Sequence, residues 1–246
     1  ANKLGTREIA FTGGEPFLNP DMLGMLEDAL SAGFQVLLLT NAMQPMQRPK
    51  IKAGLLAIKS QYGAQLTVRV SLDHHGKVLH EAERGVRTWA KAIAGLDWLS
   101  ENGFRIAIAG RTCWQESETQ SREGYAKLIA AHNWSIDASD HAALNLLPEM
   151  EQAGDIPEIT TACWSILKKS PSQMMCASSR MIVKRRGAAK PTVLPCTLIA
   201  YDERFDMGAT LTESQVADGG MFASGAVKLC HVNCAKFCVL GGGSCS

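Results

Sequence analysis

Short apolar runs alternate with amphipathic helical segments through most of this sequence, and the alternation constrains the fold more than any other feature. The runs are continuously apolar, as expected of strands that are buried on both faces. They predict strands over residues 8–12, 34–40, 66–72, 104–109 and 142–147. Helical spacing predicts helices over residues 21–32, 47–62, 89–102, 124–132 and 157–169. Five such units predict an α/β fold with a parallel sheet, and they favour a barrel or partial barrel over a short open sheet.

The composition narrows the class of protein. A formal net charge of +1 on 246 residues gives no electrostatic reason to expect nucleic acid or an anionic membrane as a partner. No apolar run approaches the length of a membrane span, and no charged-then-apolar leader opens the chain. We therefore expect a cytoplasmic protein. In that compartment, clustered cysteines favour metal or iron–sulfur ligation over disulfides.

A glycine turn, Gly13-Gly14-Glu15-Pro16, directly follows the first predicted strand. Two glycines at the end of a strand expose backbone N–H and C=O groups that can grip a small ligand, although a tight turn without a ligand would look the same. The motif resembles the GGEP motif of radical SAM enzymes, where this turn holds the amino group of S-adenosylmethionine. The resemblance implies a six-stranded partial TIM barrel, of which the five predicted strands here are the second to the sixth.

Polar residues also follow the next three predicted strands: Asn41, then Ser71 with Asp73, then Arg111. Each one alone has an ordinary reading as a turn residue, a helix start or a solvated charge. Together they predict a polar ring that suits an adenosylated amino acid, whose carboxylate and ribose need polar partners. By the resemblance, Ser71 and Arg111 fall where radical SAM enzymes contact the ribose and the methionine carboxylate. Asn41 and Asp73 complete the predicted set of cofactor-binding residues.

The segment His80-Glu81 to Arg84-Gly85 falls where related enzymes read HDxxRG. The residue types allow either a role in the site or an arginine and a glutamate that brace a loop against the barrel. We expect the bracing role.

Radical SAM chemistry also requires a [4Fe–4S] cluster, held by a Cys-x3-Cys-x2-Cys loop after the first strand, which delivers one electron to the sulfonium. No cysteine precedes Cys113 in this sequence. Either an amino-terminal segment has been lost or the protein is a degenerate relative, and the start inside a core unit favours loss. As written, the chain is not expected to cleave S-adenosylmethionine, and no catalytic residue is assigned.

The pattern changes after residue 170, where we place a boundary between a barrel domain, 1–170, and a small domain, 171–246. Two short strands over residues 181–184 and 192–194 predict a β-hairpin with a basic turn at Arg185-Arg186-Gly187. Cysteines lie on both sides of the hairpin and in a late group: Cys176, Cys196, Cys230, Cys234, Cys238 and Cys245. Soft thiolates bind zinc or iron–sulfur clusters, and the absence of Cys-x2-Cys pairs favours iron–sulfur over zinc or uninvolved thiols.

This tail resembles the SPASM and twitch domains that carry auxiliary clusters in radical SAM proteins, although its spacing departs from theirs. Six tail cysteines suffice for one complete [4Fe–4S] cluster, held by Cys176, Cys196 and two of the late four. A second cluster would need another ligand such as His231. Cys113 and Cys163 are expected to be buried small hydrophobes.

Together these expectations describe part of a radical SAM oxidoreductase that, when full-length, cleaves S-adenosylmethionine and abstracts hydrogen from a small-molecule or peptide substrate. An electron donor such as a flavodoxin or ferredoxin is implied as a partner. The alternative is a non-catalytic iron–sulfur protein, either an electron carrier or a scaffold.

Overall fold

The computed structural model divides the chain into two compact units, residues 1–147 and 148–246, which we call the N-terminal and C-terminal units. It describes residues 1–151, 153–156, 158–216, 226–228 and 231–240. The division lies between Leu147 and Pro148, whereas the sequence loses its helical periodicity and predicts a boundary near Ser170-Pro171. The domain boundary drawn there stays a prediction. None of the helices described is long and apolar enough to cross a membrane.

The N-terminal unit is built on the predicted sheet. Its strands are β1 (Glu8–Phe11), β2 (Gln35–Thr40), β3 (Leu66–Ser71), β4 (Arg105–Thr112) and β5 (Leu144–Pro148). They lie side by side in sequence order, and β1 to β4 pair in parallel. This curled sheet with its helices is a partial TIM-like barrel, as predicted.

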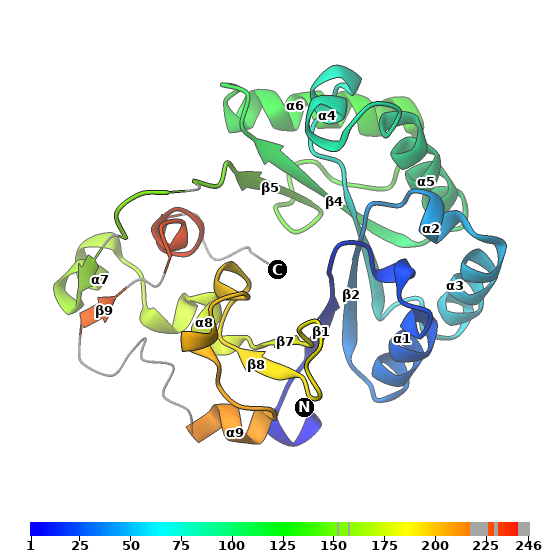
Figure 1. The fold of residues 1–246 in the computed structure, drawn as a ribbon. Coiled ribbons are helices and arrows are strands. Elements are labelled where there is room, and N and C mark those ends of the chain that lie inside the picture. Colours follow the sequence, from blue (N-terminus) through cyan, green and yellow to red (C-terminus); the bar gives the residue numbers. More distant parts are fainter. Residues whose placement is uncertain (152, 157, 217–225, 229–230, 241–246) are drawn as a thin grey trace. The chain divides into compact units, whose positions relative to one another are not determined.

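Helices cover one side of the sheet (Figure 1). They are α1 (Met22–Ser31), α2 (Gln44–Gln47), α3 (Pro49–Tyr62), α4 (Lys77–Arg84), α5 (Trp89–Glu101) and α6 (Glu118–His132). Helix α4 was not predicted. Helix α6 begins earlier than predicted because Ser117 and Gln120 form a capping box, which satisfies backbone donors of its first turn.

The two faces of the sheet differ in character. Side chains that join the helices in one apolar core are Val36, Leu38, Leu66, Val68, Val70, Ile106 and Ile108. Successive residues of a strand point to opposite faces, so Leu39, Arg69, Ser71, Ala107 and Ala109 lie on the inner face, away from these helices. Across that face, Leu39 pairs with Arg69 and Arg69 with Ala107. The inner face is thus the one available for a site.

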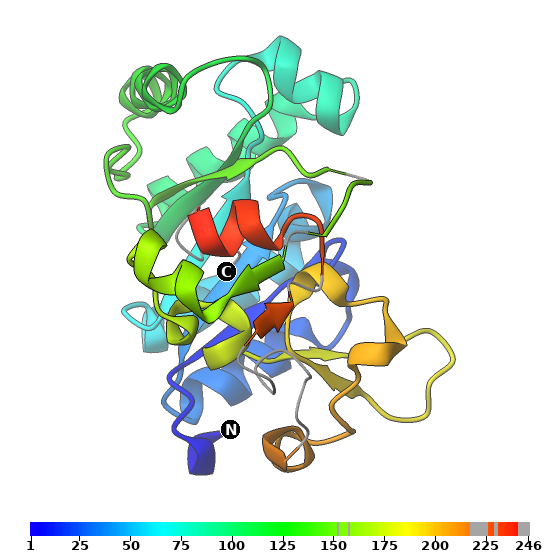
Figure 2. The same cartoon turned by 90° about the vertical axis from the view of Figure 1, so that its left-hand side faces the viewer.

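The C-terminal unit contains the predicted hairpin, formed by β7 (Met181–Val183) and β8 (Thr192–Leu194) as an antiparallel pair (Figure 2). The helix predicted over 157–169 is partly wrong. Residues Glu158–Thr160 form β6, which pairs with β9 (Ala226–Lys228), and only Thr161–Leu167 is helical, as α7. β-Branched residues favour a strand, and an antiparallel partner completes its hydrogen bonds. Shorter helices are α8 (Met175–Ser178), α9 (Leu211–Val216) and a π-helix, Ala235–Leu240.

Candidate functional site

The glycine turn after β1 leaves its backbone open. Both Gly13 and Gly14 are exposed, and a Cβ added to either would meet no atom within 4 Å. Gly13 has φ +150°, a conformation that other residues rarely adopt. The turn therefore presents its N–H and C=O groups at the carboxyl end of a parallel strand, which is where α/β folds bind ligands.

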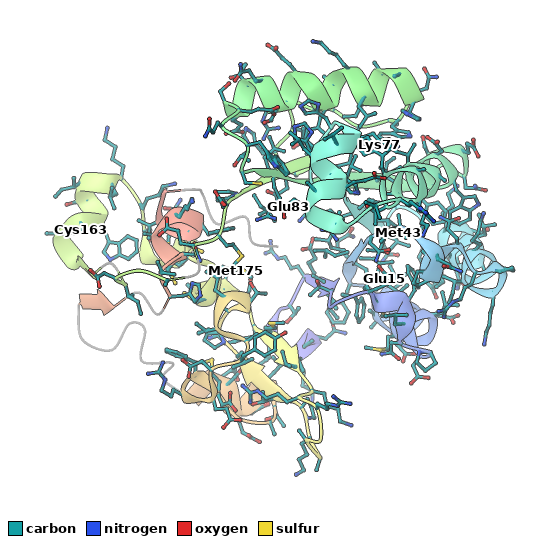
Figure 3. All side chains as sticks on the ribbon, turned by 45° about the horizontal axis from the view of Figure 1, so that its top comes forward. Glu15, Met43, Lys77, Glu83, Cys163 and Met175 are labelled. Carbon is teal, nitrogen blue, oxygen red and sulfur yellow. The ribbon has the colours of Figure 1, made fainter. Side chains whose placement is uncertain are left out.

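Glu15 ties this turn to the neighbouring strand. Its carboxylate is only 7% exposed and accepts hydrogen bonds from Thr40 Oγ1 at 2.8 Å and from the Asn41 backbone N–H at 2.9 Å. The Asn41 side chain accepts a hydrogen bond from the Met43 N–H at 2.9 Å, and Pro16 begins a buried 3₁₀ turn. In this structure the polar groups of Glu15 and Asn41 thus form hydrogen bonds with other groups of the protein. Figure 3 labels Glu15 at its place beside α1.

The last two residues of α4 hold two other residues that the sequence assigned to the cofactor. Arg84 donates to both Asp73 carboxylate oxygens, at 2.5 and 3.0 Å, and Glu83 pairs with Arg111. Figure 3 shows Glu83 on α4. The Arg111 backbone N–H also donates to the Asp73 carbonyl, at 2.9 Å. Helix α4 therefore braces the ends of β3 and β4, and the cation predicted to meet a ligand carboxylate is paired with a protein carboxylate.

A second polar cluster, which the sequence analysis missed, follows β3 and β4. Its members are His74, His75 and Glu116, whose ligand-type atoms lie within 4.8 Å of one another, close enough for a metal site. His74 Nδ1 accepts a hydrogen bond from the Gly76 N–H at 2.8 Å, so the ring proton is on Nε2, which donates to Glu116 at 3.1 Å. A metal ion on Nε2 would force that proton onto Nδ1, facing the Gly76 N–H. We therefore assign the cluster as a carboxylate–imidazole network.

The electrostatics of this network agree with that assignment. Burial and the adjacent His74 lower the pKa of His75. Desolvation acts to raise the pKa of Glu116, but hydrogen bonds from His74 and Ser121 outweigh it and leave the pKa lowered. A neutral His75 imidazole therefore faces an ionised Glu116 carboxylate at neutral pH. His75 and Glu116 line a cavity of about 540 Å³ beside α6.

The C-terminal unit gathers four thiols. Cys196 immediately precedes a 3₁₀ turn, Cys176 lies in α8, and Cys234 and Cys238 lie in or next to the π-helix. Burial raises the pKa of Cys176 to about 12, and the nearby Cys196, Cys238 and Cys234 add to the shift. As thiolates, these three cysteines would therefore repel a Cys176 thiolate. Cys230 and Cys245 lie outside the described residues.

One of these thiols accepts a hydrogen bond from the backbone. The Leu198 N–H donates to Cys196 Sγ at 3.4 Å, and N–H···S contacts of this kind stabilise thiolates and tune cluster potentials. Cys113 and Cys163 are half-buried rather than fully buried as expected, with Cys163 on α7 (Figure 3).

Comparisons with known proteins bear on this arrangement. Residues 1–115 match the sequence model of the Radical SAM superfamily. No curated protein matches the chain. The crystal structure of Streptococcus suis SuiB bound to S-adenosylmethionine is 14% identical over 86% of this chain and 55% of that one, with a TM-score of 0.55. Hexahistidine-tagged anSMEcpe with bound AdoMet is 14% identical over 87% of this chain and 65% of that one, with a TM-score of 0.57.

These findings confirm the resemblance to the radical SAM superfamily, over the segment that carries the glycine turn, Ser71 and Arg111. At such identities the structural likeness shows the fold, a partial barrel of parallel strands with helices. The chain spans 55% and 65% of the lengths of those two structures.

Proposed function

We propose that this chain is part of a radical SAM enzyme and that it binds S-adenosylmethionine at the carboxyl ends of β1 to β4. The observation that carries the proposal is the family match over residues 1–115, because this segment contains the open glycine turn and the inner-face residues next to it. The AdoMet-bound structures of SuiB and anSMEcpe, which share this fold, support it.

In this proposal each residue has one task. The backbone of Gly13-Gly14 binds the methionine amine, and the Ser71 hydroxyl, which makes no hydrogen bond within the described part of the chain, binds the ribose. Arg111 releases Glu83 and binds the methionine carboxylate in its place. Glu15 keeps the turn in place through Thr40. When bound and reduced by one electron, S-adenosylmethionine would supply the chemistry that abstracts a hydrogen atom from the substrate.

We propose further that Cys176, Cys196, Cys234 and Cys238 hold an auxiliary [4Fe–4S] cluster. Burial and the three neighbouring cysteines raise the pKa of the Cys176 thiol, so a cationic centre would be needed to hold these side chains as thiolates, which prefer iron–sulfur clusters or zinc. A flavodoxin or ferredoxin would donate electrons. A peptide is a candidate substrate because anSMEcpe, which shares the fold, has been crystallised with AdoMet and the Kp18Cys peptide; a small molecule is the other candidate.

Two measurements on anaerobically prepared protein test these proposals. Calorimetric titration should show one S-adenosylmethionine bound per chain. Iron and sulfide analysis should give about four irons per chain, lost in Cys196→Ser and retained in Cys163→Ser, the matched control. Iron without S-adenosylmethionine binding would support the alternative, a non-catalytic iron–sulfur protein. Zinc in place of iron, or no metal, would overturn the cluster assignment.

A further inference from the structure

In the part of the chain that the structure describes, the Arg69 guanidinium has a buried nitrogen without a hydrogen-bond partner. Arg69 lies in the middle of β3, is 8% exposed, and its Nε is completely buried with no hydrogen-bond partner among the described residues. Buried polar groups are nearly always hydrogen-bonded, and an unpaired buried charge destabilises the folded state. The unpaired Nε of Arg69 therefore calls for an explanation, such as a bound anion.

The neighbours of Arg69 on the inner face of the sheet cannot neutralise it. The residues that pair with it across the sheet are Leu39 on β2 and Ala107 on β4, and neither side chain has an acceptor. On the β4 side, Ala107 and Ala109 place only methyl groups on this face. Along the strand, the nearest residues on the same face are Thr67 and Ser71, two positions away on either side, and each carries an uncharged hydroxyl.

Glu8 is the acidic residue that acts on Arg69 electrostatically. Burial lowers the pKa of Arg69, and Glu8 opposes this shift. However, Glu8 is exposed at the start of β1, and the two residues form no ion pair in the described structure. This long-range attraction does not replace a hydrogen-bonded partner.

Arg111 also lies on this face, but it is paired with Glu83. Arg69 is aligned with Ala107, so four residues of β4, about 13 Å of strand, separate its level from that of Arg111. The two arginines can therefore serve two different anionic groups.

We propose that Arg69 forms an anion-binding subsite on the inner face of the sheet that holds a carboxylate of the substrate. A guanidinium offers two parallel N–H donors that match a carboxylate, and alkyl walls on both sides strengthen such a pair by excluding water. The assignment of this carboxylate to the substrate rests on the proposed function, whereas the subsite itself rests on Arg69 alone.

Arg69→Met tests the subsite without knowledge of the substrate, with malonate as the probe. Because the substitution removes an unpaired buried charge, it should raise Tm in low-salt buffer, by about 2–4 °C for each kcal/mol gained in a chain of this size. Malonate should raise the Tm of the wild-type protein more than chloride at equal ionic strength does, and should lose this advantage in Arg69→Met. Arg105→Met, an exposed arginine on the same face, is the matched control and should keep it.

A lower Tm or failure to fold in Arg69→Met would mean that Arg69 is structural, and would overturn the proposal. So would a wild-type protein that responds equally to malonate and chloride, a measurement that needs no variant. Calorimetry separates the sources of the carboxylate: affinity for S-adenosylmethionine within twofold of wild type in Arg69→Met supports the substrate, and a tenfold loss assigns Arg69 to the cofactor instead. If the wild-type protein binds no S-adenosylmethionine but shows the malonate effect, the proposed function fails and the subsite stands.

Discussion

The carboxylate of Glu15 accepts a hydrogen bond from the Thr40 hydroxyl at 2.8 Å, and this contact ties the turn after β1 to the end of β2. The same carboxylate accepts the backbone N–H groups of Asn41, at 2.9 Å, and Phe17, at 3.3 Å. A single buried side chain thus fixes the position of the open glycine backbone, which places Glu15 among the residues that shape the site.

Glu15→Gln should destabilise the protein by about 2 kcal/mol, because a neutral amide replaces charge-assisted bonds and turns an N–H₂ group toward a backbone donor. Urea unfolding followed by circular dichroism measures the loss. Glu27→Gln, at an exposed position of α1, is the control and should change stability by less than about 0.5 kcal/mol. Equal effects of the two substitutions would contradict the role assigned to Glu15.

Gly95 in α5 allows the close approach of the segment that follows β2. A Cβ at this position would lie 2.7 Å from the Ala42 Cβ and closer still to the Ala42 carbonyl oxygen. Gly95→Ala should therefore destabilise by about 1–3 kcal/mol, measured as a lower urea midpoint. Gly24→Ala in α1 meets no atom within 4 Å and should stabilise by about 0.5–1 kcal/mol. The opposite signs are the diagnostic result, and stabilisation by Gly95→Ala would show that the packing described is wrong.

Glu83 competes with a ligand carboxylate for Arg111. Glu83→Gln should raise the affinity for S-adenosylmethionine by about two- to fivefold, the range expected for removing a partly exposed ion pair. Calorimetry on anaerobic protein measures the change. Glu118→Gln, which breaks the surface pair with Arg122, serves as the control and should leave the affinity unchanged. Weaker binding in Glu83→Gln would indicate that α4 must stay anchored for the site to form.

His80 makes the stability of the N-terminal unit depend on pH. It is 1% exposed, neither ring nitrogen has a partner among the described residues, and its ring packs edge-on against Trp89. Burial lowers its pKa from the ordinary 6.5; Arg84 and His74 add to the shift, and Asp73 and Glu81 oppose it. The unfolded chain therefore takes up this proton at a higher pH than the folded protein. Stability is fully present above pH 6.5 and falls as the pH drops below it.

The slope from one such proton is at most about 1.4 kcal/mol per pH unit. Urea unfolding between pH 5 and 7.5 measures it, and His80→Leu should reduce the slope because leucine has no ring to protonate. His75, whose pKa is also lowered, should leave part of the slope in that variant. An unchanged slope in His80→Leu would exclude His80 as a source of the pH dependence.

The strands of the N-terminal unit could be predicted because a continuous apolar run indicates a strand that is buried on both faces of its sheet. Helix α4 could not, since it contributes one buried residue, His80, and leaves Val78 79% exposed. The start of α6 was readable from Ser117 and Gln120, whose spacing is that of a capping box. Strand β6 depends on a partner far along the chain, and local periodicity carries no information about it.

The strand-end positions of Gly13, Ser71 and Arg111 followed from the sequence, but their partners did not. Glu83 lies 28 residues before Arg111, and His74 and Glu116 are 42 residues apart. Such pairs form only when the ends of neighbouring strands meet. The grouping of Cys176 and Cys196 with two late cysteines was expected, and of the late cysteines that the structure describes, Cys234 and Cys238 both act on the pKa of Cys176. Their role as ligands stays a prediction.

The central claim is that the glycine turn and the adjacent strand ends bind S-adenosylmethionine. Hydrogen–deuterium exchange of the anaerobic protein, with and without S-adenosylmethionine, tests both the binding and its location. The account predicts slower exchange at the backbone amides of Gly13, Gly14, Glu15 and Phe17 and of Ser71 to His74, with no change in the peptides of α6. Protection confined to other segments, or none at saturating ligand, would contradict it.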